Sequence, residues 1–497
     1  MTMFVFRAVM IVAILSGTNS TQAAELRFEI RFTPAIHSRP FTGRVYVFTT
    51  EKKETEPRMG PNWFAPEPIV SLDVTDWQPG DPLLITSSTP GLLSLPRPLN
   101  EWPAIARRVQ AVARFNPWER NVGTGGNNGF SAVVDIPVET PAEPVSLTID
   151  QRVPLRQFND TEWSKLCSFR SDALSRFHGT DMFINAAVHL PASYYEQPRK
   201  RYPVIFNTPG FGGTHFDGIR NEPIKEDNPG GVEFIRVTLD PSCPWGHHVF
   251  ADSANNGPWG TALVKEWLPE FEKRYLTVAA PHGRFVNGHS SGGWTCLWLQ
   301  LNHRDIFGGV WSTAPDSIDF RDFSRVNIYR PGENYYRTAA GHRRPIARRA
   351  ANEVRLWIDD FDLMERVLGH GGQFESFEAV FSPRGDNDQP QRLWDRTSGV
   401  INPAVAKAWE AYDINLFLER NWATHGPKLQ GKIHIFMGEH DTFYLEGATR
   451  LVGETLKRLG SDAVVEIHPG KDHGSLLTPE LRTRIRTEMA EAFLRGE

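Results

Sequence analysis

A serine stands between two glycines at residues 288–292, which read Gly-His-Ser-Ser-Gly. In such an elbow the serine occupies a strained strand-to-helix turn, and glycine is needed where a side chain would collide with neighbouring backbone. The apolar residues at 284–286 indicate a strand end, and those at 294–301 indicate a buried helix. Ser290 is therefore a candidate nucleophile, and the N–H of Ser291 would face developing negative charge. An ordinary glycine-rich turn is the alternative interpretation, and the partners of the serine decide between the two.

A serine hydroxyl is a weak nucleophile at neutral pH, so it needs a base and a third group that orients the base. On the fold that carries such elbows, the partners follow in the order serine, acid, histidine. Asp441 lies in the loop after an expected strand at 432–437, and we predict that it is the acid, with Glu439 as the alternative. A loop carboxylate that is solvated or caps the next helix is the structural alternative for this position.

The candidate base is His473, which lies between Gly470 and Gly474 after an expected strand at 464–467. A lone loop histidine is usually a surface residue. His473 follows the serine and the acid in the order that this fold requires, and its position predicts that it accepts the serine proton. His468 lies in or beside the strand, so we expect it to pack or form hydrogen bonds there.

A glycine-rich loop at 208–213 follows an expected strand at 202–207 and would bring backbone close to a substrate. Acyl transfer needs two N–H donors for the tetrahedral oxyanion, one from the residue after the nucleophile and one from such a loop. Ser291 and Phe211 are our candidates, with Gly212 as the next choice for the loop donor. A plain tight turn is the alternative.

The catalytic candidates lie in a region where strands alternate with helical runs, which favours a doubly wound, mainly parallel sheet, an α/β fold. Its expected strands are 181–190, 202–207, 231–239, 284–286, 308–312, 432–437 and 464–467, and its clearest helices are 260–275 and 447–459. A long insertion at about 316–430 carries an expected helix at 357–369 and would form a lid or substrate wall. It also carries arginines that could bind an anion, although pairing with nearby Asp and Glu is the favoured interpretation; these are Arg343, Arg344, Arg348, Arg349 and Arg355.

The region before it predicts a smaller all-β domain, an antiparallel, immunoglobulin-like sandwich at 25–153. The expected strands are 26–32, 43–48, 69–74, 107–115, 131–136 and 145–149, although the alanines of 107–115 also favour a helix. Nothing in this domain looks catalytic, so we expect it to be structural or to help present substrate. The catalytic domain would then span 154–497.

The composition is that of an ordinary globular protein. The 497 residues are 40% hydrophobic and 23% charged, and a net charge of -5 gives no basic field that would suggest nucleic acid. Residues 1–24 have a positive start, a short apolar run and a small-residue end, which predicts a cleaved secretory signal and an exported protein, periplasmic or secreted. No later stretch reaches the length of a membrane span.

The three cysteines are too few for a disulfide scaffold and match no zinc spacing. Cys167 and Cys243 could pair in an oxidising compartment, whereas Cys296 is expected to be a buried free thiol.

The region from about residue 180 onward resembles the "Putative esterase" family of α/β-hydrolases, which includes esterase D-like S-formylglutathione hydrolases, feruloyl and acetylxylan esterases, enterochelin esterases and mycolyltransferases. The matching segments are 202–213, 251–258, 266–269 and 288–293. The resemblance implies Ser290 as nucleophile, Asp441 as acid, His473 as base, and Phe211 with Ser291 as oxyanion donors. Asp252, Asn256 and Trp259 would either line the site or cap loops. The signal sequence, the β domain and the insertion depart from the single-domain cytoplasmic members, which argues against a formylglutathione substrate.

The sequence therefore predicts an exported serine hydrolase that cleaves a carboxylic ester without metal or cofactor. Its partner would be a small-molecule or carbohydrate-linked ester, not nucleic acid, and not a membrane once the signal is removed. An acyltransferase or a peptidase on the same fold and a catalytically silent binding protein are the alternatives. Acyl and alcohol specificity and oligomeric state are not predicted.

Overall fold

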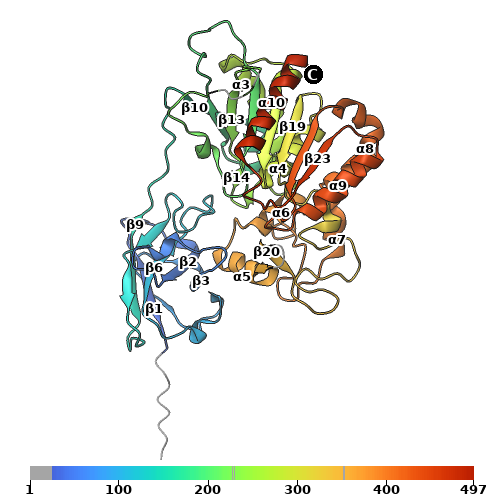
Figure 1. The fold of residues 1–497 in the computed structure, drawn as a ribbon. Helices are drawn as coiled ribbons and strands as arrows, with labels where there is room; N and C mark the ends of the chain where they lie inside the picture. The colour runs from blue at the N-terminus through green and yellow to red at the C-terminus, as the bar shows by residue number, and fades with distance from the viewer. Residues whose placement is uncertain (1–24, 226–227, 229, 351–352, 497) are drawn as a thin grey trace, which may run out of the picture.

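The computed structural model describes residues 25–225, 228, 230–350 and 353–496. An all-β region (blue to cyan in Figure 1) lies beside a larger α/β region (green to red). The last strand of the first region ends at Arg152 and the first strand of the second begins at Ser164. The expected secretory signal at 1–24 lies outside the described residues.

The all-β region is one hydrogen-bonded sheet whose order is β4-β1-β9-β7-β6-β2-β3-β5, with β8 paired to β6. Apolar residues from nearly all of these strands meet in one core, so the sheet curls around its own interior. We expected an antiparallel sandwich. The first and last strands of the region, β1 and β9, instead lie side by side and pair in parallel. The strands are β1 (Phe28–Phe32), β2 (Phe41–Thr50), β3 (Ile69–Trp77), β4 (Leu83–Ile85), β5 (Leu93–Leu95), β6 (Arg107–Ala113), β7 (Gly129–Ser131), β8 (Val134–Ile136) and β9 (Val145–Arg152).

Two details of this sheet bear on the sequence predictions. The alanine-rich segment is the strand β6, as predicted, and its alanines are buried against neighbouring strands. The expected strand at 131–136 is split into β7 and β8, which pair with successive parts of β6. Apolar patterning marks which residues are buried, but it does not show where a short strand breaks.

The α/β region is built on an eight-stranded sheet of order β10-β11-β13-β12-β18-β19-β22-β23. The pairs β10–β11 and β11–β13 are antiparallel, and the five pairs from β13–β12 to β22–β23 are parallel. All seven expected strands are present, and the edge strand β10 is an addition. The strands are β10 (Ser164–Ser171), β11 (Met182–His189), β12 (Val204–Thr208), β13 (Ile235–Leu239), β18 (Arg284–His289), β19 (Gly309–Thr313), β22 (Ile433–Gly438) and β23 (Val464–His468).

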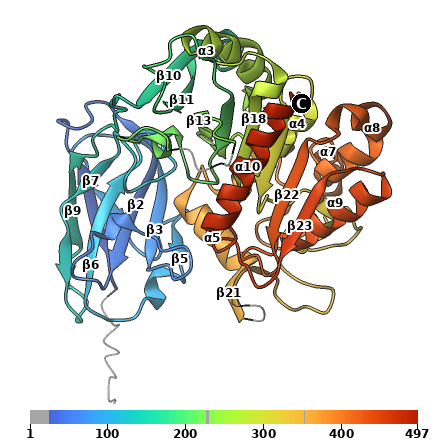
Figure 2. The same ribbon diagram turned by 45° about the horizontal axis from the view of Figure 1, so that its top comes forward.

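Helices cover both faces of this sheet (Figure 2). Successive residues of β18 point to opposite faces, so Phe285 joins the core under α10 while Val286 joins the core under α4. The 260–275 segment, expected as one helix, is helical throughout but contains a π-helical turn at Leu263–Trp267. The helices are α1 (Asp172–His178), α2 (Trp259–Ala262), α3 (Leu268–Arg274), α4 (Ser291–Asn302), α8 (Ile414–Leu429), α9 (Glu446–Arg458) and α10 (Pro479–Arg495). Two small hairpins, β14 (Ser242–Cys243) with β15 (Gly246–His247) and β16 (Asp252–Ser253) with β17 (Gly257–Pro258), precede α2.

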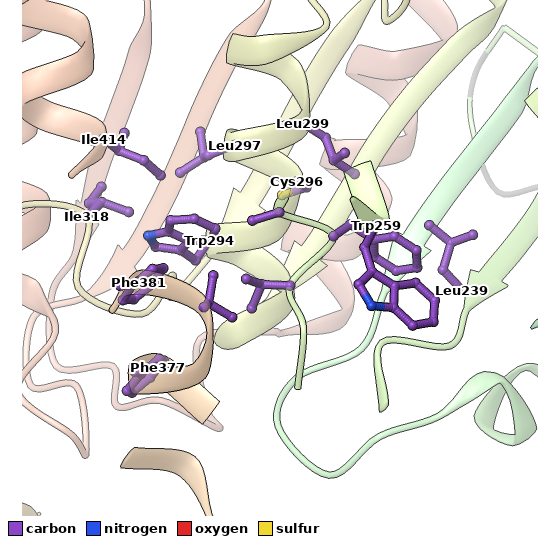
Figure 3. Packing of buried hydrophobic residues seen from close by; sticks show 14 of the residues in the cluster. Leu239, Trp259, Trp294, Cys296, Leu297, Leu299, Ile318, Phe377, Phe381 and Ile414 are labelled. Atoms are coloured by element: carbon purple, nitrogen blue, oxygen red, sulfur yellow. The ribbon is translucent and has the colours of Figure 1, made fainter. Parts of the chain in front are cut away.

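The helix after the elbow, α4, is buried on nearly every side, which explains its almost uninterrupted apolar sequence. Figure 3 shows Trp294, Cys296, Leu297 and Leu299 of this helix within the core. The ring of Trp294 packs on Phe381, with ring centroids 5.2 Å apart. Phe381 belongs to the insertion, so the insertion is part of the hydrophobic core around the elbow.

The insertion comprises β20 (Pro345–Ala350), β21 (Glu353–Trp357), α5 (Ile358–Leu368), α6 (Gln373–Phe381) and α7 (Pro403–Trp409), and the expected helix at 357–369 is α5. Its arginines form ion pairs or ring contacts within the protein, as favoured from the sequence. Arg343 pairs with Asp359, Arg344 with Glu333, Arg348 with Glu446 and Arg349 with Glu353, while Arg355 stacks on Phe64.

The all-β region holds the C-terminal end of α5, which lies between the two regions in Figure 2. Ser71 donates a hydrogen bond to the carbonyl of Val367 at 2.7 Å, and Tyr46 donates one to the carbonyl of Leu368 at 2.7 Å. The last carbonyls of a helix have no partner within the helix. Side chains of the β sheet supply the missing donors, and this fixes α5 against the β region.

All three cysteines are buried and free, so Cys167 and Cys243 do not pair, whereas Cys296 is the buried thiol that we expected. In the part of the chain that the structure describes, no helix is long and apolar enough to cross a membrane.

Candidate active site

Ser290 lies at the carboxyl end of β18 in a strained backbone conformation, with φ 59° and ψ -125°. Positive φ is uncommon outside glycine and is typical of functional turns. A Cβ on Gly288 would come within 2.0 Å of the carbonyl oxygen of Gly292, and one on Gly292 within 1.9 Å of the carbonyl oxygen of Thr208. Only glycine fits at both positions, because the elbow packs backbone directly against backbone.

His473 and Asp441 form a buried pair after the last two strands of the sheet. The Nδ1 atom of His473 lies 2.6 Å from Oδ2 of Asp441, and the Asp441 side chain is 0% exposed. The N–H of Phe443 donates to the other carboxylate oxygen at 2.8 Å, which fixes the carboxylate plane. Burial lowers the pKa of His473, but the charge and hydrogen bond of Asp441 outweigh it, so the pKa lies above its ordinary value.

Ser290 and His473 line the same cavity. Among the described residues, no hydrogen bond joins the Ser290 hydroxyl to His473; instead Oγ donates to Oδ1 of Asp316 at 3.4 Å. That contact is long for a hydrogen bond between oxygens, so it holds the serine only weakly. Hydrogen bonds of catalytic groups are often loose without substrate and tighten only in the complex.

Asp316 is a second carboxyl group beside the serine, and it was not predicted from the sequence. It follows β19, its Oδ2 accepts a hydrogen bond from the Ser291 hydroxyl at 2.5 Å, and its own N–H donates to the carbonyl of Ser290 at 3.2 Å. Burial raises its pKa to about 6. Its position in the sequence could have identified Asp316, because it is the first acidic residue after the strand that neighbours the elbow strand.

His289 also lines the cavity, and its ring lies 4.6 Å from the ring of His473. Burial and the neighbouring His473 lower its pKa to about 3, so it stays neutral. Its Nδ1 atom lies 3.1 Å from the Thr313 hydroxyl. His289 therefore shapes the wall behind the candidate base without adding charge.

The glycine-rich loop lies directly against the elbow. A Cβ on Gly210 would be 3.2 Å from Cβ of Ser290, so the loop backbone reaches the nucleophile. Within the described chain, the N–H of Phe211 donates to no protein acceptor. The N–H of Ser291 belongs to the first turn of α4, where backbone donors have no helical acceptor. Both predicted oxyanion donors are therefore placed beside Ser290 with their N–H groups available.

Other residues named from the sequence lie outside this cavity. Glu439, the alternative acid, accepts a hydrogen bond from the N–H of Gly470 at 2.9 Å and does not contact His473. Asp252 caps a turn through the N–H of Thr261, so for Asp252 the loop-capping role holds. Asn256 and Trp259 are buried beside it and likewise do not line the cavity.

The cavity has a volume of about 420 Å³, and its wall is largely aromatic. The insertion contributes Phe323, Ile346, Leu356, Phe361, Phe374 and Phe377. The all-β region contributes Trp63, Phe64 and Arg120. We expected the insertion to form a wall and the β region to be structural or to help present substrate, but the particular β-region residues that border the nucleophile were not predicted. Within the described residues, no cluster of His, Cys, Asp and Glu is arranged to hold a metal ion.

The sheet with helices on both faces and a serine elbow at its centre places the chain in the α/β-hydrolase class. Residues 178–466, more than half of the chain, match the family model described as "Putative esterase". The chain belongs to this family, and it is a hydrolase acting on esters.

Solved structures resemble the chain at low identity, and comparison with curated proteins finds no match. A ferulic acid esterase is 13% identical with a TM-score of 0.40, over 67% of this chain and 99% of that one. An S-formylglutathione hydrolase from Agrobacterium tumefaciens is 14% identical with a TM-score of 0.39, over 67% and 98%. A putative dipeptidyl aminopeptidase IV from Bacteroides ovatus is 12% identical with a TM-score of 0.38, over 86% of this chain and 48% of that one.

Proposed function

We propose that this protein is an exported serine hydrolase that cleaves carboxylic esters through an acyl-serine intermediate. One observation carries the proposal: Ser290 in its strained elbow and His473 border a single cavity, and the buried Asp441 lies behind His473 within hydrogen-bond distance of it. Ester hydrolysis by a serine needs these three groups in these roles. The composition of residues 1–24 supports export.

In the proposed mechanism, Ser290 turns away from its weak contact with Asp316 and attacks the ester carbonyl. His473 accepts the hydroxyl proton and then donates it to the leaving alkoxide. Asp441 holds the imidazole in the tautomer whose Nε2 faces the serine, and it stabilises the imidazolium that forms. The N–H groups of Phe211 and Ser291 donate to the oxyanion, and water then repeats the sequence to release the acid.

The proposed substrate class is a small-molecule or carbohydrate-linked ester with an aromatic or bulky apolar part. Phe361, Phe374 and Phe377 of the insertion line the cavity together with Trp63 and Phe64 of the β region, and the rings of Trp63 and Phe361 lie 5.1 Å apart, centre to centre. Flat apolar groups gain contact area against aromatic walls, and a volume of about 420 Å³ holds one such group.

The test is turnover of a series of p-nitrophenyl esters, from acetate to aryl acyl groups, by the protein without residues 1–24. Ser290→Ala and His473→Ala should each abolish turnover while circular dichroism shows an intact fold. A fluorophosphonate should label the unsubstituted protein at Ser290. No turnover of any ester together with no labelling would refute the proposed mechanism.

A further inference from the structure

Arg120 brings a positive charge into the wall of the active-site cavity. It lies in the segment between β6 and β7, and it borders the same cavity as Ser290 and His473. Its guanidinium carbon lies 4.2 Å from the centre of the Phe211 ring, in the loop with the proposed oxyanion donor. A Cβ on Gly212 would lie 2.9 Å from Nη2 of Arg120. The guanidinium therefore rests on the loop that touches the nucleophile.

This guanidinium contacts the Phe211 ring but has no polar partner in the part of the chain that the structure describes. Among the described residues, Arg120 donates no hydrogen bond and forms no ion pair, and its Nε atom is buried without an acceptor. The nearest acidic influences are Glu365 and Glu119, and neither comes within ion-pair distance. Glu365 is itself occupied by the N–H groups of Gln373 and Phe374, and burial raises its pKa to about 8, which weakens it as a counter-charge.

Other arginines of the protein that are shielded from solvent do have partners. Arg284 pairs with Glu272, Arg348 with Glu446, and Arg396 with both Asp362 and Glu378. A partly shielded guanidinium without a hydrogen-bond acceptor is unfavourable, and burial lowers the pKa of Arg120 to about 10, although it remains charged at neutral pH. The N–H groups of Arg120 lack acceptors among the described residues, and a bound anion would supply them.

We propose that Arg120 is a substrate-binding residue that recognises a carboxylate on the ester, so that the substrate class is an anionic ester with an apolar body. This inference rests on the proposed function, because it assigns the substrate of that same cavity. The guanidinium presents a planar fork that fits a carboxylate with two parallel hydrogen bonds, and the aromatic residues of the cavity wall would pack around the apolar body. The carboxylate belongs either to the acid part or to the alcohol part of the ester.

Paired esters that differ in one charge test this assignment. On the acid side, 4-nitrophenyl hemiglutarate is compared with the neutral 4-nitrophenyl 5-methylhexanoate. On the alcohol side, 4-acetoxybenzoate is compared with 4-acetoxybenzamide. We expect the protein to prefer the anionic member of one pair, and Arg120→Gln to lower kcat/KM for it by about 10-fold to 100-fold, the loss typical of charge-assisted hydrogen bonds. The neutral member should change by less than about threefold, within the range of context effects.

Two further variants control for charge and for structure. Arg355 is an exposed arginine that stacks on Phe64 but does not line the cavity, so Arg355→Gln should leave the ratio of anionic to neutral turnover unchanged. Arg120→Lys should keep part of the preference, because it retains the charge but loses the fork. Since Arg120 makes no hydrogen bond or ion pair among the described residues and loses only its stacking on Phe211, the melting temperature of Arg120→Gln should fall little.

Binding of benzoate and benzamide to Ser290→Ala separates this proposal from the proposed hydrolysis. Selective binding of benzoate that Arg120→Gln removes supports the anion site even if no ester is turned over. The proposal is wrong if the unsubstituted protein prefers neither charged ester and Arg120→Gln leaves benzoate binding unchanged. Equal losses on charged and neutral esters with a lowered melting temperature would show that Arg120 is structural.

Discussion

Replacing Asp441 by asparagine keeps the shape of the side chain but removes its charge next to His473. The carboxylate is fully buried and lies 2.6 Å from Nδ1 of the imidazole. Charge centres about 4 Å apart interact by about 4 kcal/mol at the effective dielectric constant of 20 found for protein sites. At 1.36 kcal/mol per factor of ten, losing this stabilisation of the imidazolium should lower kcat by about 10³-fold. Stabilisation of the wrong histidine tautomer by the amide would increase the loss.

The assay is kcat and kcat/KM of Asp441→Asn with a p-nitrophenyl ester, together with the rate of fluorophosphonate labelling of Ser290. KM should change little, because Asp441 lies behind His473 and does not line the cavity. Glu439→Gln is the matched control, since Glu439 lies in the same loop but bonds to Gly470, and its activity should stay within about threefold of normal. Activity of Asp441→Asn within tenfold of normal, or a large loss in Glu439→Gln, would refute the assignment of the acid.

Three further predictions concern pH, the elbow and the contact between the two regions. The proposed mechanism requires neutral His473, and the pKa of His473 is raised, so kcat/KM should fall as the pH drops through a value above 6.5. Asp316→Asn removes a charge that raises this pKa, so the acid limb of its pH profile should move to lower pH. A move of the acid limb to higher pH would contradict the assignment of His473 as the base. Gly292→Ala places a methyl group 1.9 Å from the carbonyl oxygen of Thr208 in β12, so it should lower the free energy of unfolding by about 3 kcal/mol or more and abolish turnover. A normal melting temperature would show that the turn tolerates a side chain. Ser71→Ala removes the shorter of the two hydrogen bonds to the carbonyl of Val367, which keeps only the 3.4 Å contact with Arg44. It should lower the free energy of unfolding by about 1 kcal/mol in urea titrations, and an unchanged midpoint would argue against this contact.

The elements that carry the chemistry could be predicted from the sequence because the order of the chain dictates where they meet. Strands β18, β22 and β23 all end at the same edge of the sheet, so Ser290, Asp441 and His473 were expected close together, and the structure places them so. The same rule applied to β19 would have identified Asp316, whose role is set by its distance from the elbow serine.

The rest of the cavity could not be predicted in this way. Trp63, Phe64 and Arg120 reach the site because the β region packs against α5, and no periodicity in the sequence encodes how two separate parts face each other. The single curled sheet could not be predicted either, because the alternation of apolar and polar residues shows which residues are buried but not which strands pair with each other. The pairing of β1 with β9 brings together residues more than one hundred positions apart, such as Phe28 and Val145.

The capping of α5 by the β region has a consequence for how such a protein can change over evolutionary time. The proposed nucleophile, base and acid lie after residue 288, while Trp63, Phe64 and Arg120 lie before the end of β9. Substitutions or exchanges in the first part of the gene can therefore alter which molecule is admitted while the reactive centre stays intact. The opposite also holds, because loss of the first part would remove both a wall of the cavity and the support of the helix behind it. Selection can thus act on part of the cavity wall through a stretch of the chain that carries none of the proposed reactive groups.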